Sequence, residues 1–256
     1  MNVIYEPNGR AREYAPLACN YYMGCVHSCK YCYAPGCMHK SSDDWHKEVK
    51  CREDYKAKFL KDVKRLHTNG DDRRVLFSFL SDPYQPIEKE HRLTRWSIET
   101  ASEYGVKVDI LTKGEKSLIL EDLPLMKRAD VHLGMTLSFI NDDSRKEWEP
   151  FASSVEDRLE ILHKAHAMGI YTWVSMEPVI IPEEALAVVR KAHKDVSFWK
   201  VGKLNHFKNI EKSISWGVLS RYHKLRDHVR RGKARPEDIS RERGTLLRIS
   251  LPMSQN

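Results

Sequence analysis

The chain alternates short apolar runs with longer segments in which apolar residues recur every three or four positions. The short runs are rich in Val, Ile, Leu and aromatic residues and are bounded by Gly, Pro, Asn or Asp, which is typical of buried strands. We expect strands over residues 17–22, 74–80, 106–112, 131–139, 171–179 and 197–204, with a further short strand at 246–251.

The segments between these runs have the apolar spacing of amphipathic helices. Ser154 is a suitable N-cap for the segment that follows it, and Gly105 and Gly169 stand where two other helical patterns stop. We expect helices over residues 52–66, 92–104, 115–128 with an interruption at Pro124, 155–168, 182–194 and 214–231.

Six strands that alternate with helices predict an α/β fold of parallel β/α units with right-handed crossovers. Six units are too few to close an eight-stranded barrel. No repeat, linker or low-complexity segment divides the 256 residues, so a single domain over 1–256 is expected. Within it we expect an N-terminal arm at 1–16, the core at 17–204, and a closing helix with a basic extension at 205–256.

Three cysteines stand close together directly after the first predicted strand. Cys25, Cys29 and Cys32 are separated by three and two residues. Three thiolates on one short loop can converge on an iron–sulfur cluster or on zinc. Zinc would need a fourth ligand, for which His27 or His39 is available, and buried thiols without a metal are a third interpretation.

The residues around the cysteines extend the pattern. Tyr31 precedes the last cysteine, and residues 20–34 (NYYMGCVHSCKYCYA) are followed later by residues 81–88 (SDPYQPIE). Together the two motifs resemble those of radical S-adenosylmethionine enzymes, in the branch that contains spore photoproduct lyase. This resemblance implies a partial (β/α)6 barrel of the TIM type, with the cluster loop after the first strand and the active site at the carboxyl ends of the strands.

The same resemblance implies the cofactors. The three cysteines would hold a 4Fe-4S cluster whose open iron binds S-adenosylmethionine. A one-electron reductant such as flavodoxin or ferredoxin would supply the electron that cleaves this cofactor to methionine and a 5′-deoxyadenosyl radical. The radical would then abstract hydrogen from a substrate that the resemblance does not identify.

Contacts to the amino and carboxylate groups of S-adenosylmethionine are expected at the ends of the second and third strands. In the family the amino group is held after the second strand, where this chain has Ser81 and Asp82 in place of the usual Gly-Gly-Glu. Lys113 or Arg158 would pair with the carboxylate. For each residue the alternative is a side chain with a purely structural role.

Other contacts are expected around the adenosine part of the cofactor. Tyr31 stands beside the cluster, Ser138 would suit the ribose hydroxyls, and Val179 would lie against adenine. Glu177, just before it, is a candidate buried carboxylate that needs a partner such as Lys200 or Lys203 on the next strand. Residues Asn205 and His206, at the same rim, are candidates for facing the substrate.

A hydrogen donor is a further expectation. Cys37, five residues after the last cluster cysteine, and Tyr84, in the second motif, are the candidate catalytic residues. Spore photoproduct lyase returns hydrogen from a cysteine well beyond its cluster motif, whereas this sequence has no cysteine after Cys51. We therefore expect that this protein does not repair spore photoproduct efficiently and acts on another substrate.

The formal net charge of +7 allows nucleic acid among the substrates. Much of the excess lies in residues 221–226 and 230–235, where a basic face could contact phosphates, although a solvated helix surface explains the same residues. All six cysteines lie at or before Cys51, which favours metal binding in a reducing compartment. No charged-then-apolar leader or membrane-length apolar run is visible. We expect a cytoplasmic monomer with no membrane partner.

Two classes of function follow from these observations. One is a radical enzyme with an unidentified substrate. The other is a non-catalytic module in which zinc or an iron–sulfur cluster supports nucleic-acid binding. The motif at 81–88 and the six β/α units favour the enzyme, because a metal-stabilised module needs neither.

Overall fold

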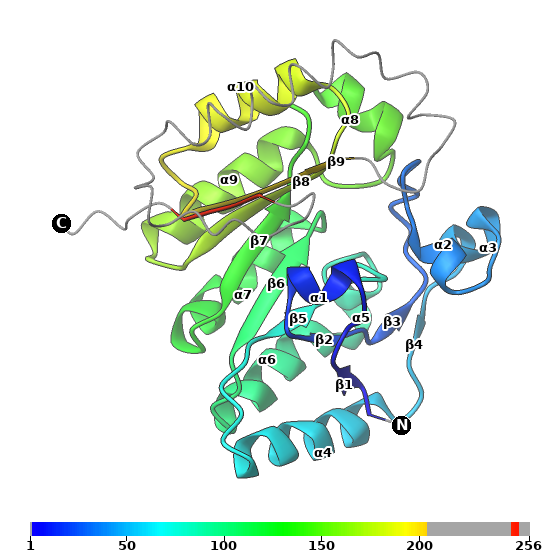
Figure 1. Cartoon of the computed structure of the whole chain (residues 1–256), viewed down its shortest axis with the longest axis vertical. Helices are drawn as coiled ribbons and strands as arrows, with labels where there is room; N and C mark the ends of the chain where they lie inside the picture. Colours follow the sequence, from blue (N-terminus) through cyan, green and yellow to red (C-terminus); the bar gives the residue numbers. More distant parts are fainter. Residues whose placement is uncertain (1, 204–246, 251–256) are drawn as a thin grey trace.

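The computed structural model describes residues 2–203 and 247–250. Its main sheet runs in the order β1-β2-β5-β6-β7-β8-β9-β10 (Figure 1). The parallel strands are β2 (Leu17–Cys19), β5 (Val75–Phe77), β6 (Val108–Thr112), β7 (His132–Thr136), β8 (Thr172–Val179) and β9 (Phe198–Lys203). The edge strands β1 (Ile4–Tyr5) and β10 (Leu247–Ser250) pair antiparallel with β2 and β9.

Five longer helices pack in a row on one face of this sheet (Figure 1). They are α4 (Tyr55–Thr68), α6 (Leu93–Glu103), α7 (Lys116–Arg128), α9 (Val155–Ala167) and α10 (Pro182–Ala192). Shorter elements stand at the ends of the strands: α2 (Ala34–Cys37), α3 (Ser42–Lys47), α5 (Glu88–His91), α8 (Asp142–Trp148), and the two-stranded sheet of β3 (Tyr22–Met23) and β4 (Lys50–Cys51). None of the helices described is long and apolar enough to cross a bilayer.

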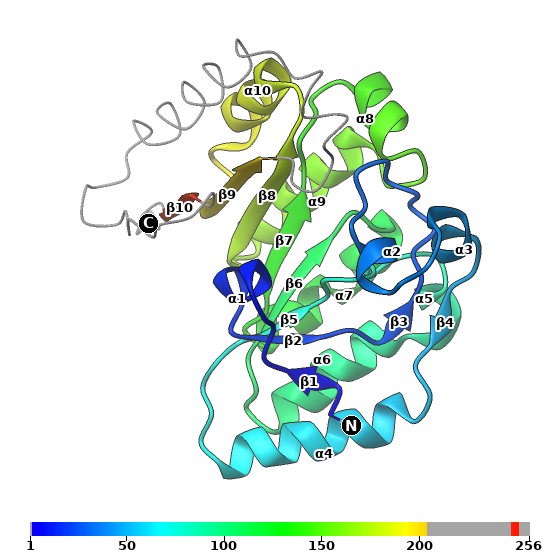
Figure 2. The same cartoon turned by 45° about the vertical axis from the view of Figure 1, so that its right-hand side comes forward.

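The short helix α1 (Arg10–Tyr14) lies on the opposite, inner face of the sheet (Figure 2). Its Tyr14 ring lies 5.9 Å from the Trp173 ring of β8 and 5.6 Å from that of Phe79. Gly134 on β7 makes room for Trp173, because a Cβ at this glycine would lie 2.1 Å from the indole. Aromatic side chains therefore close the lower part of the inner face.

The predicted α/β architecture with a partial barrel is confirmed: six parallel strands alternate with helices in the predicted order. The cysteines follow the first parallel strand, as expected. The short strand expected at 246–251 is present as β10. The helix expected at 214–231, with Asn205, His206 and the basic segments, lies outside the described residues.

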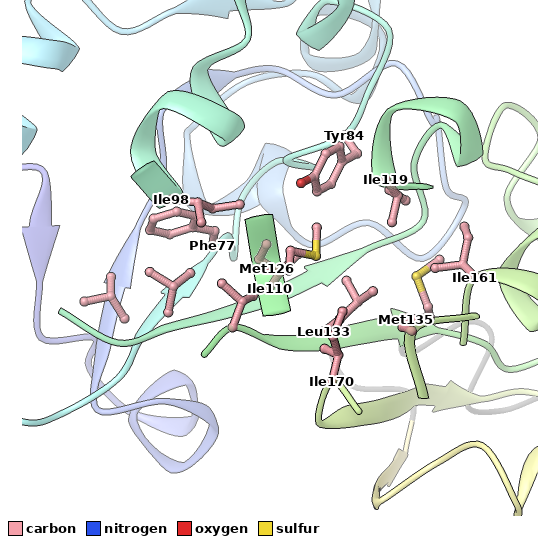
Figure 3. Close-up of a cluster of buried hydrophobic side chains, with 14 of the residues drawn as sticks. Phe77, Tyr84, Ile98, Ile110, Ile119, Met126, Leu133, Met135, Ile161 and Ile170 are labelled. Atoms are coloured by element: carbon pink, nitrogen blue, oxygen red, sulfur yellow. The ribbon is translucent and has the colours of Figure 1, made fainter. Parts of the chain in front are cut away.

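The core lies between the sheet and the outer row of helices (Figure 3). Along β8, Val174 and Met176 belong to this core, whereas Trp173 packs on the inner face, as strand alternation requires. Strands and helices both contribute labelled residues to Figure 3, including Phe77, Ile110, Leu133, Met135, Ile98, Ile119, Met126 and Ile161. The inner face carries the separate aromatic cluster around Trp173 and polar side chains such as Ser175 and Glu177.

The predicted interruption at Pro124 is wrong, because α7 runs without a break from Lys116 to Arg128. A proline inside a helix removes one hydrogen bond to the carbonyl four residues earlier, here that of Leu120. Pro124 is exposed, so this face of α7 is accessible to water that can bind the carbonyl. Leu123, Leu125 and Met126 on the other face are buried and keep the helix on the sheet.

A buried carboxylate joins β3 to the start of α6. Glu88 is completely buried and accepts hydrogen bonds from the Tyr22 hydroxyl and, at 2.8 Å, from the Thr94 backbone nitrogen. Burial raises the pKa of Glu88 to about 7, against an ordinary value of 4.5, although these hydrogen bonds oppose the rise. The folded protein therefore holds this proton more tightly than the unfolded chain does.

We expect the free energy of unfolding to fall as the pH rises from about 4.5 to 7. The part due to Glu88 is fully present below pH 4.5 and is lost as the pH passes 7, a change of about 3 kcal/mol. Glu88→Gln should remove this part of the slope. Burial also raises the pKa of Glu177 to about 7, so the contribution of Glu177 to the pH dependence of unfolding should remain in the variant. Urea unfolding at pH 5 and pH 8 tests this, and equal pH dependence in both proteins would contradict it.

Candidate functional site

The cysteines lie on a loop, residues 24–33, that leads from β3 to α2 (Figure 2). The loop starts at Gly24, which has a φ of +98°. A Cβ here would lie 2.2 Å from the carbonyl oxygen of Glu48, so only glycine fits this turn. This residue brings the cysteine loop close to the segment after α3.

Cys25 and Cys29 are each only 9% exposed, and Cys32 is partly buried. Burial raises the pKa of all three thiols, that of Cys29 to about 12, and the neighbouring Asp82 and Cys29 raise that of Cys25 further. Thiolates are thus unfavourable here without a cation. Within the described residues the sulfurs do not surround one point, since no three His, Cys, Asp or Glu side chains form a metal-binding group. Cluster binding would require these side chains to turn toward a shared position.

The first half of the cysteine loop is held by α3 and by the motif at 81–88. The Cys25 nitrogen donates to the Trp45 carbonyl at 3.3 Å, and His46 Nδ1 lies 2.6 Å from the Cys25 carbonyl oxygen. The Ser81 hydroxyl donates to the Gly24 carbonyl at 2.6 Å. The predicted cofactor residue Ser81 is therefore placed beside the loop, where it also fixes the loop backbone.

Asp82, in the same motif, ties the second and third parallel strands together. It is 5% exposed and accepts hydrogen bonds from the Thr112 hydroxyl at 2.6 Å and from the backbone nitrogens of Lys113 and Tyr84 at 2.7 and 2.8 Å. His27 Nδ1 lies 3.6 Å from the same carboxylate, and burial lowers the pKa of this histidine although Asp82 opposes the change. Asp82 therefore positions Lys113 and the middle of the cysteine loop together.

Lys113 follows β6 and points toward the cysteine loop. Its Nζ lies 5.7 Å from the centre of the Tyr31 ring. Burial disfavours the charged ammonium, but Cys29, Glu149 and Asp82 outweigh burial and raise the pKa of Lys113 above its ordinary value. The site therefore holds the ammonium of a partly buried lysine next to the cysteines.

A buried ion pair that the sequence did not reveal lies at the Tyr31 hydroxyl. Arg158 Nη1 is 2.6 Å from Glu149 Oε2, and both side chains are 0% exposed. The Tyr31 hydroxyl donates to the other oxygen of Glu149. Burial alone would raise the pKa of Glu149, but the charges of Arg158 and Lys113 and these hydrogen bonds lower it. Glu149 is thus a buried anion.

Two predicted cofactor residues carry buried polar atoms without a partner among the described residues. These are Nη2 of Arg158 and the hydroxyl of Ser138, both in fully buried residues. Arg158 Nη1 also donates to the Thr136 carbonyl at 2.9 Å, which fixes the guanidinium at the end of β7. Free donors at the carboxyl ends of parallel strands suit a ligand with carboxylate and hydroxyl groups.

Val179, the predicted adenine contact, ends β8 and is 5% exposed. The next residue, Ile180, packs in a small apolar cluster with Cys29, Tyr31 and Phe139. The apolar contact expected at this strand end therefore reaches the cysteine loop.

The two candidate hydrogen donors lie in different surroundings. Tyr84 is fully buried in the core (Figure 3), and its hydroxyl donates to Asp122 of α7 at 2.9 Å. Cys37 is exposed at the end of α2. The structure thus directs the Tyr84 hydroxyl toward α7 and away from the cysteine loop.

Glu177 lies on the inner face, as expected for a carboxylate that needs a partner. A Cβ at Gly202 would lie 2.1 Å from Glu177 Oε1, so this glycine makes room for the carboxylate against β9. Lys200, in the neighbouring strand, lowers the pKa of Glu177 but does not cancel the effect of burial. The Lys200 ammonium also lies 3.0 Å from the centre of the Tyr14 ring.

Comparison with known families identifies the superfamily of this chain. The family described as the Radical SAM superfamily matches residues 19–196, which include the cysteine loop and the residues described above from Asp82 to Ile180. The chain belongs to the Radical SAM superfamily. Members of this superfamily are enzymes, so the alternative of a non-catalytic metal module is not favoured.

Two relatives of this radical SAM protein have names that describe them as uncharacterized. One from Methanocaldococcus jannaschii is 32% identical over 169 residues, which cover 65% of this chain and 61% of the relative. One from Mycobacterium tuberculosis is 26% identical over 183 residues, 68% of this chain and 52% of the relative. The match thus spans less than two thirds of either relative.

Solved structures show the same fold. Spore photoproduct lyase complexed with dinucleoside spore photoproduct has a TM-score of 0.61 at 15% identity, over 96% of this chain and 71% of the lyase. Streptococcus suis SuiB bound to S-adenosylmethionine has a TM-score of 0.58 at 13% identity, over 83% of this chain and 47% of SuiB. At these identities the likeness supports the partial barrel.

The residues present fit the cofactors that the superfamily implies. Three cysteines on one loop are the donor set of a site-differentiated iron–sulfur cluster. The Lys113 ammonium and the unpaired donors of Arg158 and Ser138 suit the carboxylate and hydroxyl groups of S-adenosylmethionine.

Proposed function

We propose that this protein is a radical SAM enzyme that binds a 4Fe-4S cluster through Cys25, Cys29 and Cys32 and cleaves S-adenosylmethionine reductively. The observation that carries the proposal is the grouping of the cysteine loop with two cations, the partly buried Lys113 and the fully buried Arg158, at the carboxyl ends of the parallel strands. The cluster and cofactor would supply the electron transfer and the 5′-deoxyadenosyl radical that removes hydrogen from a substrate.

The chain's own residues bind and orient the cofactor in this proposal. Lys113 pairs with the carboxylate, since it is the ammonium that stands beside Cys29. Arg158 offers its free Nη2 to the same end of the cofactor, and Ser138 offers its hydroxyl to the ribose. Asp82 holds the Lys113 backbone in place. Val179 and the neighbouring Ile180 give adenine an apolar surface.

The substrate is a separate part of the proposal. The spore photoproduct lyase structure holds a dinucleoside, and the net charge of +7 makes this chain suitable for a polyanionic partner. We infer that nucleic acid is the first substrate class to test and that a flavodoxin or ferredoxin supplies the electron. The absence of any cysteine after Cys51 still favours a reaction other than spore photoproduct repair.

We expect the anaerobically reconstituted and reduced protein to form 5′-deoxyadenosine slowly from S-adenosylmethionine without substrate. Chromatographic detection of 5′-deoxyadenosine and absorption near ~400 nm from thiolate-to-iron charge transfer are the measurements. The same reaction with dinucleoside spore photoproduct should yield 5′-deoxyadenosine without multiple-turnover recovery of the repaired dinucleotide. Zinc uptake with no S-adenosylmethionine binding in calorimetry would contradict the proposal.

A further inference from the structure

The segment that joins α8 to α9, residues 149–154, has its backbone shape fixed by two buried arginines. Arg145, only 5% exposed, donates from Nη1 to three carbonyl oxygens of this α8–α9 connection, at 3.1, 3.3 and 3.1 Å. Arg158 donates from Nε to the carbonyl of Ser153 at 3.0 Å. The connection is therefore held in shape by contacts that lie outside the cysteine loop.

This surface, together with the last residue of α8, binds the middle and the second half of the cysteine loop. The contacts are hydrogen bonds from the Lys30 nitrogen to the Trp148 carbonyl at 2.9 Å, from the Phe151 nitrogen to the His27 carbonyl at 3.3 Å, and from the Tyr31 hydroxyl to Glu149. Outside the buried zone, Lys30 Nζ lies 3.3 Å from Glu147. Among these contacts, Glu149 is the one acceptor that is both buried and charged. Hydrogen bonds to charged groups are stronger than those between neutral groups, so the bond from Tyr31 to Glu149 is the strongest of the set.

The two halves of the loop are held by different elements. Cys25 is held by Trp45 and His46 of α3, as described above. Cys29 and Cys32 flank Tyr31, whose hydroxyl and ring are fixed by Glu149 and by the apolar cluster at Ile180. Loss of one set of contacts should therefore free one end of the loop and leave the other end in place.

We propose that Glu149 is a positioning residue that acts through Tyr31 to hold Cys29 and Cys32 for cluster binding, independently of the contacts that hold Cys25. The part of this inference that concerns cluster binding rests on the proposed function. The arrangement itself can be tested on the apoprotein, where no cluster, cofactor or reductant is needed. The buried pair with Arg158 keeps Glu149 ionised and so keeps the bond to Tyr31 strong.

The test is pulse labelling of the reduced apoprotein with N-ethylmaleimide, with each cysteine resolved by mass spectrometry. In Glu149→Gln and Tyr31→Phe, Cys29 should label roughly tenfold faster than in wild type, the change that corresponds to loss of one hydrogen bond to a charged acceptor. Cys25 should not change. His46→Ala is the matched control and should give the opposite pattern, with faster labelling of Cys25 alone.

Cys19, which is 0% exposed in β2, serves as the reference for general loss of stability. Equal acceleration at Cys19 and Cys29 would mean that the variants merely unfold more often and would overturn the proposal, as would unchanged labelling of Cys29 in both variants. In reconstituted protein, Glu149→Gln should also lose iron to a chelator several-fold faster than wild type. A third outcome is that the apoprotein shows the expected labelling but the protein never takes up iron. This outcome would refute the proposed function and leave the positioning role of Glu149 intact.

Discussion

Alanine in place of Cys25, Cys29 or Cys32 is expected to abolish loading of a 4Fe-4S cluster. Each thiol lies on the same short loop, and a cluster bound by only two protein thiolates loses a full iron–sulfur bond that neither water nor a neighbouring carboxylate replaces well. Iron and sulfide content after anaerobic reconstitution, with the absorption near ~400 nm, measures the effect.

Cys51→Ala is the matched control, because Cys51 is partly buried in β4, outside the cysteine loop. This variant should load iron as wild type does. Cys37→Ala should do the same, since the Cys37 thiol is exposed at the end of α2. Full iron content in the triple alanine variant would show that the cluster, if present, is bound elsewhere.

The parallel strands could be predicted because each contains a short run of largely apolar, buried residues between turn residues. Their lengths could not: the expected strand at 17–22 ends at Cys19, and Tyr22 pairs with Cys51 in a separate small sheet. The apolar run continues beyond the last hydrogen bond of β2 because the residues that follow this strand are buried as well. Apolar residues alone therefore do not mark the end of the strand. The edge strand β1 has only two residues, too few to show any alternation.

The site was predicted where motifs are local in sequence and missed where pairing is long-range. Cys25, Ser81 and Asp82 stand in short recognisable motifs, and the structure brings these motifs together. Glu149 lies in a polar segment with no periodic signal, and its partner Tyr31 is 118 residues away. Two local indications of this region were present: Arg158 follows Glu149-Pro150 at a spacing that resembles that of the branch, and the helix N-cap at Ser154 places Arg158 one turn into α9.

The second large effect is expected when the ammonium of Lys113, beside the cysteines, is removed. Lys113→Met should weaken binding of S-adenosylmethionine by about 30-fold or more, the usual result of removing one member of a buried charge pair. Methionine keeps most of the apolar stem, so packing against Tyr31 should survive, and the backbone bond to Asp82 does not involve the side chain. Calorimetry with the reconstituted protein measures the affinity, and iron content should stay at the wild-type level.

Lys116→Met is the control that separates this local effect from a change in net charge. Lys116 opens α7 three residues further on, and its partly exposed ammonium pairs with Asp157 and Glu160 of α9 at 2.8 and 2.6 Å. Surface pairs of this kind contribute little, and the side chain does not approach the cysteine loop. Equal loss of affinity in both variants would therefore point to the overall field of the protein, whereas loss in Lys113→Met alone assigns the cofactor carboxylate to the end of β6.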